Sequence, residues 1–411
     1  MPDRGYRSMN GRWDINRRDF LKQGAAASAG VLVGGMVLGN PGLWAQEGEK
    51  QKPPPKPKTN LEDALKVPRG KYSLPGEFPG KSVEVYSEKV LQDGNINPAA
   101  LAPMFTAGIE SLTGVRQDEA QGLFFNSDDV VGIKVNPVGA GLINTRLELV
   151  DEIIKWLEEG GVKRENIIIW DRFDYMLADA GYTSERFPKV GIVGLQTMDE
   201  AAYMGEAEDD SGWLDENGHH LSEANFDQES YYWADVEAPQ DQQYLNQHVF
   251  NTRYSYFGKL LTEKLTKIIN VPVYKNTGNG ISMATKNLGY GAICNTGRLH
   301  KPLFFDVCTE VLAFPCIREK LVLNITDGLR GQYEGGPMPN AEFAFEHKRL
   351  YFATDPFALD MVCHNQLVEI REKNKVKVNR HPMYTEYLRY AEKLELGIVD
   401  PDKTEHLYVE V

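Results

Sequence analysis

The sequence predicts an α/β fold in which a mainly parallel sheet is flanked by helices. The first observation is a series of short apolar, β-branched runs, each ending in a polar residue, as buried strands do. The second is an amphipathic helix pattern between the first two runs, all within about forty residues. Strand, helix and strand in this order form a βαβ unit, so these two strands should be parallel.

Five strands are expected from the apolar runs. They lie at residues 130–135, 167–170, 268–273, 321–325 and 350–353. The polar residues at or near their ends are Asn136, Asp171, Lys275, Asp327 and Asp355. Pro272 weakens the third run as a central strand, because proline cannot donate a hydrogen bond to a neighbouring strand.

The best-defined helix lies between the first two strands. Thr145 and Glu148 have the spacing of a capping box, and Gly160-Gly161 marks the end. Its apolar stripe consists of Leu147, Val150, Ile154 and Leu157. Further helices are expected at residues 304–314, 356–372 and 383–394. Asp355-Pro356 is a good start for the second of these, with Asp as the cap and Pro in the first turn.

The N-terminal segment predicts export of the folded protein. Arg17-Arg18 precedes Phe20-Leu21-Lys22 and a Gly/Ala-rich apolar run at 24–38, which is typical of a twin-arginine signal peptide. That run is too short to span a bilayer as a helix. We therefore expect a signal peptide at 1–45, cleaved after Ala45, and recognition by the twin-arginine export machinery. The mature protein should be periplasmic or extracytoplasmic, with no stable membrane span after cleavage.

Three segments should follow the signal peptide. A Pro/Lys-rich linker is expected at 46–66, and a single α/β domain at 67–411. This domain should contain an acidic, aromatic-rich insertion at about 199–252, because fourteen acidic residues and no Lys or Arg lie between Asp199 and Asp241. A solvated flap is the main interpretation. The alternative is a calcium site around Asp209, Asp210 and Asp215, although the spacing does not fit an EF-hand loop.

Charge and cysteine content exclude several classes of protein. The formal net charge is −14, and removal of residues 1–45, with six basic and three acidic residues, leaves −17 (−14 − 3). Such an acidic chain argues against nucleic acid or anionic lipid as a partner. The four cysteines, at positions 294, 308, 316 and 363, match no zinc or iron–sulfur spacing. No metal site is therefore assigned and the cofactor is unknown; buried free thiols are expected, with one disulfide as the alternative.

The polar residues at the strand ends predict a common pocket. In an open parallel sheet, ligands bind beyond the carboxyl ends of the strands, where these five side chains should meet. Each residue also has a structural explanation. Asp327-Gly328 is a common turn pair, Asp355 fits a helix cap, and Asp171 fits the start of a loop.

The segment that starts at Lys275 predicts an anion cradle. Residues 275–282 contain two glycines and lead into a short helical stretch that ends near residue 289. Glycines let the backbone approach a ligand, and amides at a helix start favour an anion. Lys275 and Lys286 would add positive charge. The residue order of a P-loop is absent, and a surface loop with solvated lysines is the alternative interpretation.

Two further titratable residues are candidates. His300 follows this segment, and a neutral imidazole among lysines has a lowered pKa, which suits a general base or a metal ligand. A structural loop histidine is the alternative. Asp360, one turn into an apolar helix, either orients a pocket lysine or faces water. No nucleophile elbow, His-Glu-x-x-His site, Cys/His dyad or dinucleotide glycine fingerprint is present, which removes the commonest hydrolase and dehydrogenase assignments.

The order of these motifs resembles the bacterial and archaeal family called domain of unknown function 362, some members of which carry iron–sulfur modules. The resemblance spans about residues 130–411 without the acidic insertion. It is carried by Val131-Gly132-Ile133-Lys134-Val135-Asn136, Lys275, Lys286-Asn287-Leu288-Gly289, His300, Asp327-Gly328 and Asp355-Pro356-Phe357-Ala358-Leu359-Asp360. It implies a fold and candidate residues rather than a reaction.

The chain departs from the family pattern at three places. The family's Gly-Asp-Ser is Trp170-Asp171-Arg172 here, its Lys-Thr/Ser-His is Lys275-Asn276-Thr277, and its Glu-Gly-x-Gly-Pro loop is shortened to Glu334-Gly335-Gly336-Pro337. No ferredoxin-type cysteine cluster is present, so an iron–sulfur function does not carry over.

The main hypothesis is an exported α/β enzyme, or enzyme-like protein, that binds a small anionic ligand at the carboxyl edge of its sheet. The candidate catalytic residues are His300, Asp327 and Asp171. The candidate ligand-binding residues are Lys134, Asn136, Lys275, Asn276, Lys286, Asn287, Asp355 and Asp360. Two other hypotheses are a non-catalytic periplasmic accessory protein that docks through the acidic insertion, and a cofactor carrier.

Overall fold

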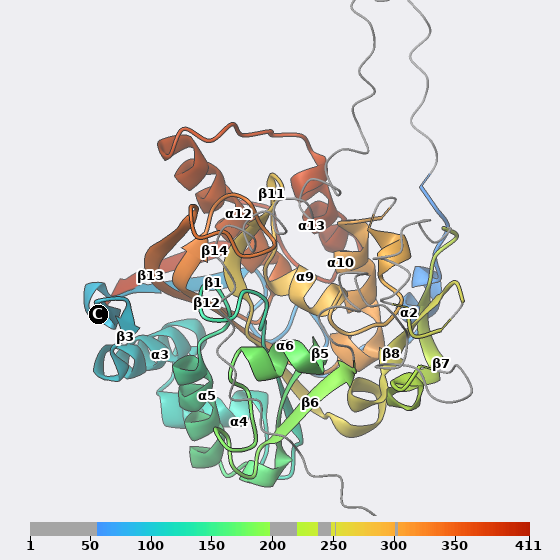
Figure 1. The fold of residues 1–411 in the computed structure, drawn as a ribbon, viewed down its shortest axis with the longest axis horizontal. Coiled ribbons are helices and arrows are strands. Elements are labelled where there is room, and N and C mark those ends of the chain that lie inside the picture. Colours follow the sequence, from blue (N-terminus) through green and yellow to red (C-terminus); the bar gives the residue numbers. More distant parts are fainter. Residues whose placement is uncertain (1–55, 198–219, 237–247, 251, 301–302) are drawn as a thin grey trace, which may run out of the picture. The chain divides into compact units, whose positions relative to one another are not determined.

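The computed structural model describes residues 56–197, 220–236, 248–250, 252–300 and 303–411 (Figure 1). The predicted signal peptide lies outside these residues, as does the first half of the predicted linker. The same holds for the part of the acidic insertion that contains Trp213 and the alternative calcium ligands Asp209, Asp210 and Asp215.

One mixed, mainly parallel sheet of ten strands organises the fold, as predicted. Its order is β14-β1-β13-β12-β9-β4-β5-β6, with β10 paired to β12 and β11 paired to β10. The strands are β1 (Lys81–Tyr86), β4 (Val131–Lys134), β5 (Ile167–Phe173), β6 (Gly191–Gln196), β9 (Lys267–Asn270), β10 (Val273–Thr277), β11 (Gly280–Ile281), β12 (Leu321–Gln332), β13 (Ala344–Ala353) and β14 (Glu405–Glu410). Strands β12, β9, β4, β5 and β6 are parallel neighbours in this order, whereas β13 is antiparallel to both β12 and β1.

Helices cover both faces of the sheet (Figure 1). The first layer consists of α3 (Pro98–Thr113), α4 (Gln117–Phe124) and α5 (Leu147–Glu159). The second contains α9 (Ala284–Gly289), α10 (Asp306–Glu310), α11 (Pro315–Arg318) and α13 (Met383–Lys393). The remaining helices are α2 (Leu61–Leu65), α6 (Asp174–Asp179) and α12 (Pro356–Lys373). The helices predicted at 356–372 and 383–394 are confirmed, and the one predicted at 304–314 is a shorter α-helix followed by a 3₁₀ turn at Val311–Ala313.

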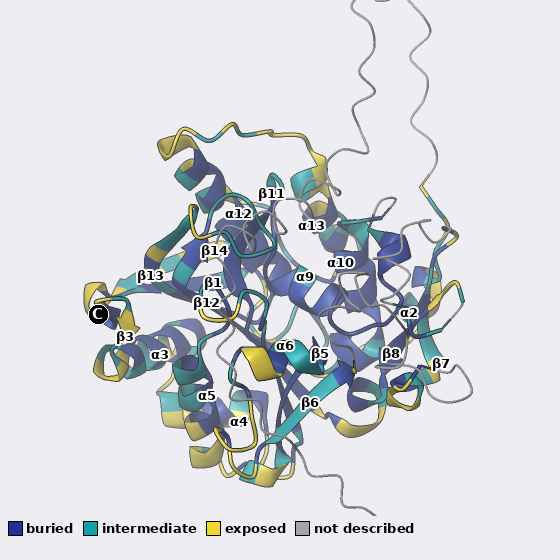
Figure 2. Cartoon of the chain, viewed as in Figure 1, coloured by how far each residue is buried: buried dark blue, intermediate teal, exposed yellow. Residues whose placement is uncertain are grey.

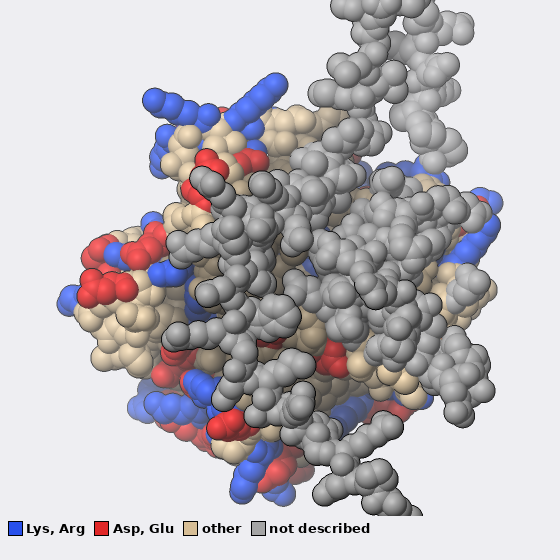
Figure 3. All heavy atoms as spheres, in the orientation of Figure 1, with Lys and Arg blue, Asp and Glu red and all other residues tan. Residues whose placement is uncertain are grey.

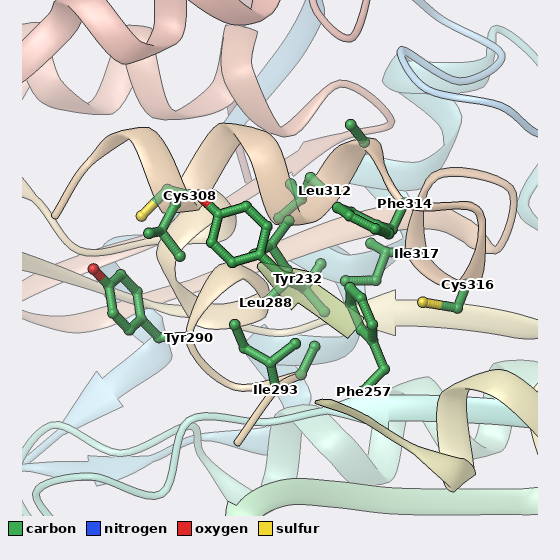
Figure 4. Close-up of a cluster of buried hydrophobic side chains, with 14 of the residues drawn as sticks. Tyr232, Phe257, Leu288, Tyr290, Ile293, Cys308, Leu312, Phe314, Cys316 and Ile317 are labelled. Carbon is green, nitrogen blue, oxygen red and sulfur yellow. The ribbon is translucent and has the colours of Figure 1, made fainter. Parts of the chain in front are cut away.

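Strand β5 shows how the sheet separates two apolar cores. Its side chains alternate between the faces, as the pleat requires. Ile167 and Ile169 pack with the α3–α5 layer, whereas Ile168 and Trp170 pack with the layer that contains α9 and α10. Figure 2 shows the central strands as buried, and Figure 4 shows part of the second core around Tyr232, Leu288 and Phe314. The sheet is therefore buried on both faces, which explains its continuous apolar runs.

Three predicted strands have different bounds or directions in the structure. The run at 268–273 is two strands, because Pro272 interrupts it and β10 moves across to pair with β12. Strand β12 continues to Gln332, so Asp327-Gly328 lies inside a strand rather than in a turn. Strand β13 is antiparallel to β12, so its carboxyl end lies at the opposite edge of the sheet from the carboxyl ends of β4 and β5.

The capping box predicted at the start of α5 is wrong. The Thr145 hydroxyl donates to the Val271 carbonyl oxygen at 2.7 Å and accepts from the Asn136 amide at 2.8 Å, so it ties strand ends together. The helix begins after Arg146, whose amide donates to the Asp327 carboxylate at 2.7 Å. A carboxylate from a distant strand thus takes the place of a local cap.

Parts of the predicted linker and insertion belong to the folded core. Helix α2 lies within the predicted linker and buries Leu61 and Ala64. Within the predicted insertion, β7 (Phe226–Trp233) pairs with β8 (Tyr254–Gly258), and Tyr232 is fully buried. The short strands β2 (Leu91–Gln92) and β3 (Asn95–Ile96) form a separate hairpin. No helix in the described part of the chain is long and apolar enough to cross a membrane.

The structure shows the state of the cysteines and, on one face, the distribution of charged side chains. All four cysteines are buried free thiols, as predicted. On the face shown in Figure 3, basic and acidic side chains of the described residues are interspersed.

Candidate functional site

A buried ion pair lies at the centre of the candidate site. Lys134, the last residue of β4, is 1% exposed and pairs with Asp171 of the neighbouring strand β5, which is 6% exposed. The Lys134 ammonium also donates to the Val135 carbonyl oxygen at 2.8 Å and to Asn287 Oδ1 at 3.0 Å. Its three N–H groups therefore all have acceptors, so Lys134 is held as a cation.

Asparagine side chains connect this ion pair to a second lysine. The Asn136 side-chain amide donates to Asn287 Oδ1 at 3.1 Å, and Lys275 Nζ donates to Asn136 Oδ1 at 2.9 Å. Lys275 is 1% exposed. The structure thus links Lys134, Asn136, Asp171, Lys275 and Asn287 by hydrogen bonds. Three of the five strand-end residues, Asn136, Asp171 and Lys275, are among them.

Lys286 completes what we call the lysine cluster, defined as Lys134, Lys275 and Lys286. Its positive charge contributes to lowering the pKa of Lys275. Its ammonium lies 5.1 Å from the centre of the Phe304 ring and 6.0 Å from that of Tyr290, which fits two cation–π contacts. Among the described residues, Lys286 has no hydrogen-bond acceptor and no ion-pair partner.

The lysine cluster has unusual electrostatics. Burial lowers the pKa of Lys134, although Asp171 opposes this effect. Burial, then the charges of Lys286 and Lys134, lower the pKa of Lys275 to about 7, and burial lowers that of Lys286 to about 8. Of the three lysines, only Lys134 pairs with a carboxylate among the described residues, so the cluster and Asp171 together carry more positive than negative charge when all are ionised. Such an excess is costly in a protein interior and favours an anionic ligand.

His300 lies beside Lys286 but is poorly suited to act as a base. Its Nδ1–H donates to the Thr296 carbonyl oxygen at 2.9 Å, and its ring lies 4.6 Å from that of Tyr290. Burial, and then the nearby Lys286 charge, lower the pKa of His300 to about 3. The imidazole is therefore neutral near neutral pH, and only a weak proton acceptor. Its predicted catalytic role stays a prediction.

The Asp327 carboxylate binds backbone amides rather than the lysine cluster. Its carboxylate accepts from the amides of Arg146 at 2.7 Å and Leu329 at 3.1 Å. Burial raises its pKa to about 6. In the described part of the chain it makes no hydrogen bond or ion pair with a lysine of the cluster. Asp327 holds the start of α5 against β12, and its catalytic role stays a prediction.

Asp355 does not join the predicted pocket. It lies just beyond β13, whose antiparallel direction places it at the other edge of the sheet. Its carboxylate accepts from Phe357 and Ala358 at 2.9 and 3.0 Å, which makes it the cap of α12. It also accepts from Gly80 at 3.2 Å and Ile398 at 2.7 Å. The alternative explanation as a helix cap is therefore the one that the structure supports.

Asp360 neither orients a cluster lysine nor faces water. The fully buried carboxylate accepts from the amides of Ala284 at 2.9 Å and Thr285 at 3.0 Å, and from the Thr285 hydroxyl at 2.6 Å. These are the first amides of α9, the helix that was expected to offer its start to an anion. The anion at the start of α9 is therefore Asp360 itself, which positions the helix that carries Lys286 and Asn287.

The predicted backbone cradle at 275–282 is a β-hairpin instead. Strands β10 and β11 pair through Asn276 and Ile281, and the Ser282 amide donates to the Lys275 carbonyl oxygen at 2.8 Å. Asn276 Oδ1 accepts from Gly336 N at 2.9 Å, so this side chain ties down the 334–337 loop. The hairpin contributes Lys275 to the site, whereas its paired amides are not available to a ligand.

Sequence reasoning missed three residues that support the site. Asn270 Oδ1 accepts from the Asn287 side chain at 2.8 Å, and the Asn270 amide donates to Asn324 Oδ1 at 2.9 Å. Polar residues inside the apolar runs of β9 and β12 were the available signal. Gly291 is also required, because a Cβ there would lie 2.5 Å from Lys134 Cε. The glycine makes room for the buried lysine.

Other features lie apart from the cluster. No group of three or more His, Cys, Asp or Glu side chains in the described ranges is arranged to hold a metal ion. A hollow of about 570 Å³ lies elsewhere, and none of the predicted site residues lines it. Its lining residues are His220, Leu221, Glu223, Ala224, Phe226, Gln228 and Lys259.

Comparison with known proteins agrees with part of the resemblance. No curated protein matches the chain. The matched family segment starts later and ends earlier than expected from the motifs, so it contains Lys275, Lys286, Asn287 and His300 but excludes Lys134, Asn136 and Asp171. The lysine cluster is thus shared between the matched segment and the preceding βαβ unit. Residues 234–365 of this chain match the model of the family described as Domain of unknown function (DUF362).

Proposed function

We propose that the lysine cluster is the binding site for a small anion at the carboxyl edge of the parallel sheet. The observation that carries the proposal is the charge imbalance: Lys134 and Lys275 are buried and Lys286 is half-buried, yet only Lys134 has a carboxylate partner among the described residues, Asp171. A buried cation without a counter-ion is expensive, so an ammonium group that stays unpaired in a protein needs a functional reason.

The two unpaired lysines are the ones placed to contact a ligand. Lys275 has an amide oxygen as its hydrogen-bond acceptor, and Lys286 lies over the rings of Tyr290 and Phe304 without a hydrogen-bond acceptor or ion-pair partner among the described residues. Asn136 and Lys286 are partly exposed, which gives a ligand a side from which to approach. Lys134 is already paired with Asp171, so it is not placed to bind a ligand itself. Asp171 is then a positioning residue for Lys134, and its predicted role in proton transfer stays a prediction.

Anion binding should weaken as the pH rises through the pKa values of the free lysines, about 7 and about 8. A bound anion favours the charged lysines, so binding is coupled to proton uptake, and affinity should fall by about tenfold per pH unit above the first pKa. Calorimetric titration with acetate, pyruvate and inorganic phosphate, from below pH 7 to above pH 8, measures this.

Two variants make the binding experiment specific. Lys286→Met should weaken binding of the anion that the wild type prefers by at least about tenfold. Lys155→Met, on the exposed face of α5, serves as the control and should bind as the wild type does. Equal affinities of the two variants, or an affinity that does not change with pH, would contradict the proposal.

We further propose that the chain is exported by the twin-arginine machinery before it acts. Arg17-Arg18, the following Phe20-Leu21-Lys22 and the weakly apolar run support this proposal. Substitution of both arginines by lysine should retain the full-length chain in the cytoplasm of a bacterium that has this machinery. Wild-type protein recovered from the periplasm should begin after Ala45. Periplasmic accumulation of the double-lysine variant would disprove this route.

A further inference from the structure

We propose that Lys275 forms a covalent imine with the carbonyl carbon of a 2-oxo acid, whose carboxylate is held by Lys286. This inference rests on the proposed anion site and names its substrate class. Imine formation requires an amine with a free lone pair, held in a dry site near other cations. A 2-oxo acid carries both groups that such a site recognises, a carbonyl for the amine and an adjacent carboxylate for the remaining charge.

The contacts of the three lysines single out Lys275 as the nucleophile. All three N–H groups of Lys134 are used by Asp171, Val135 and Asn287, so its nitrogen is held as an ammonium. Lys286 lies against the rings of Phe304 and Tyr290, an arrangement that favours the cation. Lys275 has one hydrogen bond within the described residues, to an amide oxygen, which a neutral amine can also donate.

The protonation states of the cluster agree with these roles. With a pKa of about 7, Lys275 is neutral in a large fraction of molecules near neutral pH, whereas Lys286, with a pKa of about 8, remains mostly charged. The Asn136 side chain, fixed by Asn287, positions the Lys275 nitrogen. Between these two pKa values the site therefore contains one nucleophilic amine and one cation for the carboxylate.

The chemical step needs no further reactant. The Lys275 nitrogen adds to the carbonyl carbon, and one amine proton passes to the carbonyl oxygen to give a carbinolamine. A second proton, from solvent or a neighbouring ammonium, allows the hydroxyl group to leave as water. The products are one water and an iminium ion that retains one N–H. No electrons are transferred to or from an external group.

Borohydride trapping tests this inference on the full-length protein. Pyruvate is added together with sodium borohydride, which reduces an imine to a stable secondary amine, and digested peptides are analysed by mass spectrometry. We expect one reduced pyruvate per chain, on Lys275, with labelling fastest between the two pKa values, about 7 and about 8. Lys275→Arg keeps the charge but cannot form the imine, so it should not be labelled at this position. The control Lys155→Arg should be labelled as the wild type is.

Two further arms separate the imine from simple anion binding. Lys286→Met should reduce pyruvate labelling of Lys275 by at least about tenfold, because the carboxylate loses its partner. Calorimetry of pyruvate binding is run on the same samples. Binding without labelling would overturn the imine and leave the anion site intact, whereas absence of both would overturn both proposals. Labelling spread over surface lysines, or at an unchanged level in Lys275→Arg, would also overturn the imine.

Discussion

Replacement of Lys275 by methionine should raise the free energy of unfolding at neutral pH by about 1–3 kcal/mol, while anion binding weakens by at least about tenfold. Replacement of a lysine that stabilises the fold would instead lower the free energy of unfolding. The gain is expected because Lys275 is 1% exposed, has no carboxylate partner among the described residues, and lies close enough to Lys286 for that charge to lower its pKa. Methionine has a similar volume and carries no charge, so the desolvation penalty disappears.

The pH dependence of stability identifies the cause. The pKa of Lys275 is lowered from 10.5 to about 7 in the folded protein, so the unfolded chain binds more protons between these values. The contribution of Lys275 to stability is therefore unfavourable below pH 7, and stability should rise as the pH increases from about 7 towards 10.5. The Lys275→Met variant should lack this increase of the free energy of unfolding with pH.

Urea denaturation of wild type, Lys275→Met and the exposed control Lys155→Met, at several pH values, measures both effects. The control should leave this increase with pH unchanged. A variant that is less stable than the wild type at neutral pH would show that Lys275 is a structural residue, and the charge argument for the site would fail with it.

The sequence was sufficient for those parts of the fold that local patterns define. The β4–α5–β5 unit follows from apolar runs and one amphipathic helix, so its parallel strands and the neighbouring positions of Lys134 and Asp171 could be predicted. The direction of β13 could not be predicted. A fully buried strand has the same apolar pattern whether its neighbours are parallel or antiparallel, and Asp355 was misplaced for that reason.

The lysines of the candidate site and Asp171 could be predicted, whereas the positions of the other aspartates could not. Lys275 was suggested by its place near the end of an apolar run, and Lys134 by the family motif at 131–136. Aspartates instead bind backbone amides readily, and nothing in the sequence shows which amides will lie nearby. Asp327 and Asp360 each hold the start of a helix that is remote in sequence, α5 and α9 respectively. They position the helices around the site but do not line it.

Substitution of Asp171 by asparagine should have the largest destabilising effect, about 3–5 kcal/mol, because it leaves Lys134 buried without its counter-ion. Lys134 is fixed between β4, β5 and α9, and Gly291 packs against its stem, so the ammonium cannot turn towards solvent without disturbing the core. Lys134→Met should also destabilise the protein, since it leaves the Asp171 carboxylate buried alone.

The double variant Lys134→Met with Asp171→Asn provides the decisive comparison. With both charges removed, no unpaired ion remains, and we expect the double variant to be more stable than Asp171→Asn alone. In a double-mutant cycle by urea denaturation this appears as a coupling energy of about 2–3 kcal/mol. Additive effects would mean that the two residues act independently. In that case Lys134 would be a third uncompensated cation, and the anion site would extend to it.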